Sequence, residues 1–266
     1  FVAWREPLFL TNDDGIDAPG LHRLIQILHG RGHPIAVLAP AREQSATSMR
    51  LSLRAEMAFN DRNDLAETLG LDSEGPPVRI FSLDGSPCDC TIVAIDQGFE
   101  SWAQMIRPQM CISGINFGPN ISIDVIHSGT VSAAREAGLY GLPAIALSLG
   151  TYLHDDFSVG TEAILKLIDR ALLVANTEPS NLKRTRGSKH HPWGDPEMPM
   201  DERIREAFRS GDLILNLNTP HEWNGVVETV PLGARWYHGA TKPTENNDGF
   251  ILGAASIEDE PLPKTD

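Results

Sequence analysis

Two adjacent carboxylates, Asp13 and Asp14, follow a short apolar run at residues 8–10 and precede Gly15. Turn-forming residues after an apolar run predict a buried strand that ends in a loop. Strand side chains alternate between faces, so the acids can converge only beyond the strand, where Gly15 permits a sharp turn. Paired carboxylates repel each other unless a cation lies between them. A hard divalent ion such as Mg²⁺ or Mn²⁺ prefers such oxygen ligands, and an acidic turn without an ion is the alternative.

A second segment with chemical potential is the tripeptide Ser128-Gly129-Thr130, which precedes an alanine-rich helical pattern at residues 131–139. The pattern predicts that a helix begins here, and the free N–H groups of a helix start can bind phosphate. A plain Ser/Thr helix cap is the alternative. Because this helix start and the acidic loop are both predicted at the same edge of the sheet, we favour phosphate binding.

The acidic loop is predicted to lie between a strand and a helix. Asp17 suits an N-cap and Pro19 suits the first helical turn, and a stripe of leucine and isoleucine follows at helical spacing. Residues 34–39 then predict a second buried strand, so the three elements form a right-handed βαβ unit. In open α/β sheets, ligands bind outside the carboxyl ends of strands, where Asp13 and Asp14 are expected.

The rest of the chain repeats this alternation. Core strands are predicted at residues 78–83, 110–113, 144–149 and 213–217, and helices at residues 87–97, 131–139, 159–174 and 201–208. The predicted fold class is α/β, a Rossmann-like three-layer sandwich with a mostly parallel sheet and a C-terminal β arm. Alternating apolar residues at 51–59 predict a half-buried strand or hairpin arm.

We expect two regions along the chain. Residues 1–218 form the Rossmann-like catalytic domain, with surface insertions at about 60–77 and 176–199. Residues 219–266 form a C-terminal extension, which we interpret as an oligomerisation arm.

Composition excludes several classes of protein. The 266 residues carry a formal net charge of −14, which argues against wrapping a nucleic-acid polymer, because that requires many Lys and Arg contacts to phosphate. No apolar run reaches the length of a membrane span. The three cysteines suit a reducing compartment, so we expect a cytoplasmic protein, and Cys88 and Cys90 are expected to pack in a helix.

Several motifs, taken together and in order, resemble the stationary-phase survival protein (SurE) family. They are TNDDGIDAPGL at 11–21, APAREQS at 39–45, DGSPCDC at 84–90, SGIN at 113–116, SGTVSAARE at 128–136 and LNLN at 215–218. Members of that family are metal-dependent phosphatases that act on nucleoside monophosphates. The resemblance spans roughly residues 8 to 218.

The resemblance implies a set of site residues and one divalent ion, Mg²⁺ or Mn²⁺. The implied metal ligands are Asp13, Asp14, Ser45 and Asn116; the implied catalytic residues are Asp13, Asp14 and Asn116; and the implied phosphate-binding residues are Asn120, Ser128, Gly129 and Thr130. It also implies a homodimer or homotetramer with exchanged arms, and a chain that stops short of the family's final strand. The sequence departs from the family pattern at Ser122, where glycine is usual, and at His127, where tyrosine is usual.

We therefore expect a phosphomonoesterase that hydrolyses nucleoside monophosphates, a 5′-nucleotidase with 3′-nucleotidase and polyphosphatase side activities. His127 is a candidate general acid by position only. The alternatives are a metal-dependent nucleotide-sugar or nucleotidyl transferase and a non-catalytic nucleotide-binding stress protein. The chain has no Gly-rich loop ending in Lys-Ser/Thr, and no cysteine followed six residues later by arginine, so other phosphate chemistries fit poorly.

Overall fold

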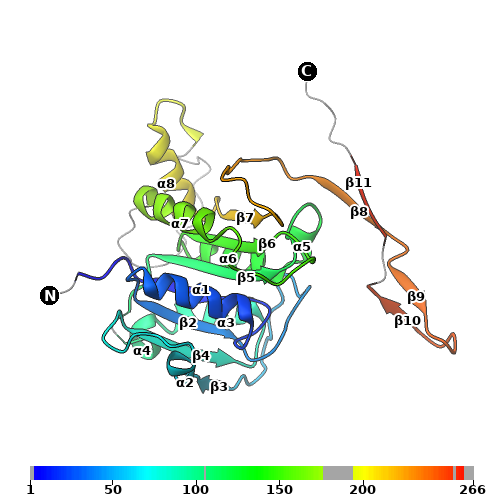
Figure 1. Cartoon of the computed structure of the whole chain (residues 1–266), viewed down its shortest axis with the longest axis horizontal. Coiled ribbons are helices and arrows are strands. Elements are labelled where there is room, and N and C mark those ends of the chain that lie inside the picture. The colour runs from blue at the N-terminus through cyan, green and yellow to red at the C-terminus, as the bar shows by residue number, and fades with distance from the viewer. Residues whose placement is uncertain (1–2, 105, 176–193, 254–255, 261–266) are drawn as a thin grey trace.

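The computed structural model describes residues 3–104, 106–175, 194–253 and 256–260. A central sheet carries helices on both faces, and a thin arm extends away from it (Figure 1). Most of the predicted insertion at 176–199 lies outside the described residues.

The sheet has seven strands in the order β3-β4-β2-β1-β5-β6-β7. All neighbours are parallel except β3, which pairs antiparallel with β4 at one edge. The strands are β1 (Leu8–Thr11), β2 (Ile35–Pro40), β3 (Phe59–Asp61), β4 (Val78–Leu83), β5 (Met110–Phe117), β6 (Ala144–Leu149) and β7 (Leu215–Thr219). The predicted mostly parallel α/β sheet is therefore confirmed.

Eight helices surround the sheet within the described residues. They are α1 (Pro19–Gly30), α2 (Asp64–Thr68), α3 (Pro87–Asp96), α4 (Phe99–Trp102), α5 (Asp124–His127), α6 (Gly129–Leu139), α7 (Thr161–Ala175) and α8 (Met200–Ser210).

The sheet separates two hydrophobic cores. Leu8 and Leu10 of β1 pack in the core that contains α1 and α7, whereas Phe9 packs in the core that contains α3 and α6. All three side chains are fully buried, because a central parallel strand is covered on both faces. This is the three-layer arrangement that the sequence predicts, and it fixes β1 as the rigid base of the acidic loop.

Helix α3 begins at a capping box, as predicted. The Ser86 hydroxyl accepts a hydrogen bond from the Asp89 N–H at 3.1 Å, and the Asp89 carboxylate accepts one from the Ser86 N–H at 2.8 Å. The reciprocal bonds satisfy two backbone donors that a helix start leaves free. Cys88 and Cys90 lie buried in this helix as free thiols, which confirms their packing role.

Two predictions of local structure are wrong. Ala18 occupies the N-cap position of helix α1 with no side-chain cap, and Asp17 instead forms an ion pair with Arg62 at 2.7 Å. Residues 51–58 form no strand, and the Leu53 side chain is 79% exposed. The Ser52 N–H donates to the Asp89 side chain of α3. The segment is therefore attached to a helix there and not paired with a neighbouring strand.

The C-terminal β arm consists of two antiparallel pairs. Strand β8 (Ala234–His238) pairs with β11 (Ser256–Glu260), and β9 (Thr241–Pro243) pairs with β10 (Phe250–Leu252). Both pairs lie away from the main sheet (Figure 1). Among the described helices, none is both long and apolar enough to cross a membrane.

Gly20 allows α1 to approach the sheet closely and provides a stability test. A Cβ at this position would lie 2.0 Å from the Ile115 carbonyl oxygen, which is backbone and cannot move aside cheaply. We expect Gly20→Ala to lower the melting temperature by several degrees, since overpacking costs about 1–3 kcal/mol and each kcal/mol is worth about 2–4 °C at this size. Differential scanning calorimetry measures the shift.

Gly30 in the same helix is the matched control. A Cβ there would meet nothing within 4 Å. Gly30→Ala should leave the melting temperature unchanged or slightly higher, because alanine favours the helix. Equal melting temperatures for the two variants would contradict the close packing of α1 on β5.

Candidate functional site

The acidic loop after β1 is held in a turn by the Asn12 side chain. The Asn12 amide donates to the Gly15 carbonyl at 2.8 Å and accepts from the Gly15 N–H at 3.2 Å. Gly15 has φ +99°, and a Cβ there would lie 3.0 Å from the backbone of Arg42. The Gln44 N–H donates to the Asp13 carbonyl at 2.7 Å, so the loop after β2 is attached to the acidic loop.

Asp13 is buried against the start of helix α6. The Thr130 hydroxyl donates to its carboxylate, and the backbone N–H groups of Thr130 and Gly129 also stabilise the charged form. Burial raises the pKa of Asp13, and these hydrogen bonds oppose that rise. Gly129 permits the contact, because a Cβ there would lie 2.7 Å from the Asp13 Cβ.

Asp14 is half-buried beside Asp13. Its carboxylate accepts a hydrogen bond from the Phe117 N–H at 3.2 Å. Burial, followed by the negative charges of Asp13 and Glu43, raises the pKa of Asp14 to about 7. A bound divalent cation would offset both causes, so the electrostatics of the pair fit a metal site.

The raised pKa of Asp14 predicts how stability depends on pH when no metal is bound. The folded protein holds this proton up to about pH 7, whereas the unfolded chain releases it near the ordinary value of 3.8. Between these values the folded state binds more protons, so its stability is greatest at the acidic end and is lost as pH rises through about 7. We expect the melting temperature in excess EDTA to fall between about pH 5 and pH 8.

Asp14→Asn is the control for that pH dependence, since it cannot titrate. Calorimetry across the same range should show a shallower fall in melting temperature for the variant than for the parent. Identical slopes would mean that Asp14 titrates as an ordinary carboxyl.

Asn116 and Ser45 lie near the carboxyl ends of the two strands that flank β1. Asn116 is in β5 beyond an irregularity in its pairing with β6, and its amide nitrogen donates to the Gly118 carbonyl at 2.8 Å. That bond leaves the amide oxygen as the remaining ligand atom. Ser45 is exposed in the loop after β2, where its N–H donates to Glu43 at 3.0 Å.

The four predicted metal ligands thus come from the loops after β1 and β2 and from the end of β5, three strands that are adjacent in the sheet. The described residues contain no cluster of three or more His, Cys, Asp or Glu side chains that could hold a metal. The predicted ligands are instead two carboxylates and two neutral oxygens. A hard divalent cation, which binds oxygen ligands and keeps several water ligands, fits this set. Metal ligation by these residues stays a prediction.

The predicted phosphate site lies against the acidic loop, and several of its polar groups already have partners. Ser128 is the N-cap of α6, and its hydroxyl accepts from the Val131 N–H at 3.0 Å. Asn120 is buried, and its amide donates to the Ser148 hydroxyl at 2.8 Å. Asn120 therefore attaches this loop to β6. Phosphate binding by these residues stays a prediction.

The loop between β5 and α6 is also attached to the C-terminal arm. Ser122, where the family usually has glycine, keeps a left-handed φ of +53°, and its hydroxyl accepts from the Arg235 N–H at 2.7 Å. The Tyr237 hydroxyl donates to Asp124 in α5. His127 is exposed at the end of α5, and its carbonyl accepts from the Ser48 N–H at 2.9 Å.

Sequence reasoning missed several of these supporting contacts. The Asn12 turn has a local signal, because an Asn side chain at a turn commonly binds the backbone of residues that follow it. The bonds from Thr130 and Phe117 to the two acids have none, since 117 and 103 residues separate the partners.

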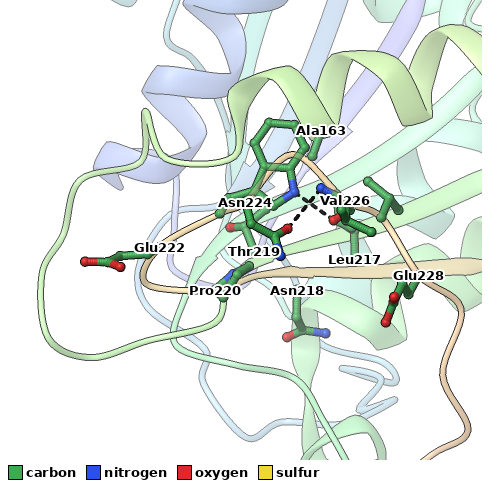
Figure 2. A pocket seen from close by; sticks show the side chains of 11 residues that line it. Ala163, Leu217, Asn218, Thr219, Pro220, Glu222, Asn224, Val226 and Glu228 are labelled. Carbon is green, nitrogen blue, oxygen red and sulfur yellow. Dashed lines mark hydrogen bonds between the residues drawn. The ribbon is translucent and has the colours of Figure 1, made fainter.

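A separate hollow of about 150 Å³ lies at the end of β7 and does not include the acid pair. Its loop folds on itself: the Trp223 indole donates to the Val226 carbonyl at 2.9 Å, and the Val226 N–H donates to the Asn224 side chain at 3.0 Å. Figure 2 shows Glu222 and Glu228 on opposite sides of this hollow. The hollow therefore offers no paired carboxylates.

The parallel sheet and the carboxyl ends of β1, β2 and β5 define a Rossmann-like α/β protein with an all-oxygen candidate metal site at that edge. The chain belongs to the family of the survival protein SurE, whose model matches residues 8–238.

Curated relatives and a solved structure agree with this assignment. The chain is 33% identical over 237 residues to the 5′-nucleotidase SurE of Carboxydothermus hydrogenoformans, covering 86% of this chain and 72% of that protein. It is 36% identical over 229 residues to the 5′-nucleotidase SurE of Crocosphaera subtropica, covering 80% and 78%. The crystal structure of the SurE protein from Aquifex aeolicus has the same fold, with a TM-score of 0.61 and 21% identity over 96% of this chain and 82% of that one.

Proposed function

We propose that this chain is a metal-dependent phosphomonoesterase that hydrolyses nucleoside monophosphates to nucleoside and phosphate. The observation that carries the proposal is the Asp13–Asp14 pair packed against the start of α6, where Thr130 and backbone N–H groups contact Asp13. The substrate class is supported by relatives named 5′-nucleotidase SurE, at 33–36% identity.

Asp13, Asp14, Ser45 and Asn116 would hold the divalent ion. When bound, such an ion polarises a phosphate oxygen and lowers the pKa of a coordinated water. The two carboxyls must lose their protons to become ligands, so the raised pKa of Asp14 makes binding weaker in acid.

The chain's own groups orient these ligands and stabilise charge. Thr130 fixes the Asp13 carboxylate, and the Phe117 N–H fixes that of Asp14. The N-terminal end of α6 carries a partial positive charge next to the acids. We assign it the stabilisation of the negative charge that develops on the phosphate during hydrolysis.

A panel of nucleotides and metals tests the proposal. Phosphate release from AMP should require Mg²⁺ or Mn²⁺, and excess EDTA should abolish it. Release at full rate in excess EDTA would contradict the proposal. Hydrolysis of a nucleotide sugar without hydrolysis of AMP would favour the transferase alternative, and tight binding without turnover would favour a non-catalytic nucleotide-binding protein.

Finer features belong to the same proposal. We include a preference for the 5′ phosphate with 3′-nucleotidase and polyphosphatase side activities, Mg²⁺ or Mn²⁺ as the ion, and a homodimer or homotetramer. We also include residues 219–266 as an extension separate from the catalytic domain, through which the chains assemble. Phe250 and Leu252, which are exposed on the projecting arm, support this role. The three free cysteines support a reducing, cytoplasmic setting.

A further inference from the structure

Two exposed aromatic rings lie at the same edge of the sheet as the acid pair. Phe117 ends β5 and is 42% exposed, and Tyr152, 66% exposed, follows β6. Strands β5 and β6 are neighbours, and the two ring centroids are 5.6 Å apart at 85°. We call this pair of rings the aromatic shelf.

The aromatic shelf is continuous with the candidate catalytic site. The Phe117 N–H donates to the Asp14 carboxylate at 3.2 Å, so one ring of the shelf belongs to a residue that contacts the acid pair. The aromatic shelf is therefore the neighbouring surface for the ribose and base of a nucleotide whose phosphate lies at the acid pair.

The neighbouring residues support both rings in place. The buried Phe157 ring lies 6.4 Å from the Phe117 ring. Gly118, at φ +105°, leaves space for Tyr152, because a Cβ there would lie 2.3 Å from the Tyr152 ring. Single exposed apolar residues need no explanation, but a supported pair of rings beside a phosphate-type site offers a preorganised stacking surface.

We propose that the aromatic shelf binds the nucleobase of the substrate and thereby distinguishes nucleotides from other phosphomonoesters. This inference rests on the proposed function and adds to it the group that recognises the base. Planar bases stack on aromatic side chains irrespective of their hydrogen-bonding edges. The aromatic shelf therefore accepts both purine and pyrimidine nucleotides.

The test compares two substrates that share a phosphate and a ribose. For the parent and Tyr152→Leu, kcat/KM is measured with AMP and with ribose 5-phosphate, which lacks the base. We expect the ratio of the two values to fall at least about 5-fold in Tyr152→Leu, the lower end of what base stacking on one aromatic ring supplies. Phe117→Leu should lower the ratio in the same direction, and Tyr152→Phe should keep it.

Leu153→Ala is the matched control, because Leu153 is the next residue and is 78% exposed. It should leave the ratio at the parental value. An equal loss for both substrates in Tyr152→Leu would mean that the ring only supports the loop, and an unchanged ratio would mean that no base contacts it. Either result would overturn the proposal that the aromatic shelf binds the base.

Adenosine separates failure of this inference from failure of the proposed function, since it has a base and no phosphate. Its binding is measured by saturation-transfer NMR, which requires no turnover. Adenosine should bind the parent, and Tyr152→Leu should bind it at least about 5-fold more weakly. Equal binding of adenosine to both proteins, or no binding to the parent, would overturn the proposal that the aromatic shelf binds the base. A parent that binds adenosine but hydrolyses no phosphomonoester would overturn only the hydrolytic function.

Discussion

Asp14→Asn is expected to lower kcat/KM for AMP by about 100-fold or more, because it removes a negative ligand while keeping the shape of the side chain. Changes to groups that merely support metal ligands typically cost about 10- to 100-fold, so a ligand itself should cost at least the upper value. The Phe117 N–H can still donate to the asparagine oxygen, so the loop should keep its conformation. The measurement is steady-state phosphate release at saturating Mn²⁺.

Asp17→Asn makes the same substitution in the same loop and serves as the control. Asp17 is exposed and pairs with Arg62, and an asparagine at this position still offers Arg62 one oxygen acceptor. Its kcat/KM should stay within about 2-fold of the parent, since it only changes a surface charge. Comparable losses in both variants would show that the loop as a whole, and not the acid pair, limits activity.

Saturating Mn²⁺ is expected to raise the melting temperature of the parent by about 5–10 °C. An ion that binds only the folded state adds about 2.7 kcal/mol at 100 times its dissociation constant, and each kcal/mol is worth about 2–4 °C at this size. Burial and, after it, repulsion from the neighbouring carboxylates raise the pKa of Asp14 to about 7, and a bound cation would offset both, which favours binding to the folded protein. Differential scanning calorimetry with and without Mn²⁺ measures the gain.

Asp13→Ala should lose that gain. Without metal it should also melt below the parent, because the Thr130 hydroxyl and the start of α6 lose their buried acceptor. The difference between the two metal conditions is therefore the decisive quantity. A gain in Asp13→Ala equal to that of the parent would remove Asp13 from the ligand set.

Local patterns allowed much of the fold to be predicted. The apolar run of β1 and the Ser86 capping box act within a few residues, so their signals are readable in sequence. Asp17 was misassigned because Arg62, 45 residues away, offers its carboxylate an alternative partner. Alternation did not produce a strand at residues 51–58, because this segment is attached to Asp89 of α3 through the Ser52 N–H and leaves Leu53 exposed, and β3 begins only at Phe59.

The composition of the candidate site was readable from motifs, but its geometry was not. Strand order decides which loops meet, and β1 lies between β2 and β5 only in the folded sheet. The partners of Asp13 and Asp14, the Thr130 hydroxyl and the Phe117 N–H, are distant in sequence, so no local pattern in the chain reports them. Tertiary packing, which periodicity cannot report, places these groups.

The central claim, that the Asp13–Asp14 pair is a metal site, is tested most directly by a Mn²⁺ titration. Electron paramagnetic resonance measures the concentration of free Mn²⁺ at each step. The titration compares the metal-free parent with Asp14→Asn and Asp17→Asn at neutral pH. We predict one ion per chain for the parent and Asp17→Asn, and an affinity at least about 10-fold weaker for Asp14→Asn. Equal affinity of Asp14→Asn and the parent, or no bound ion in the parent, would contradict the assignment.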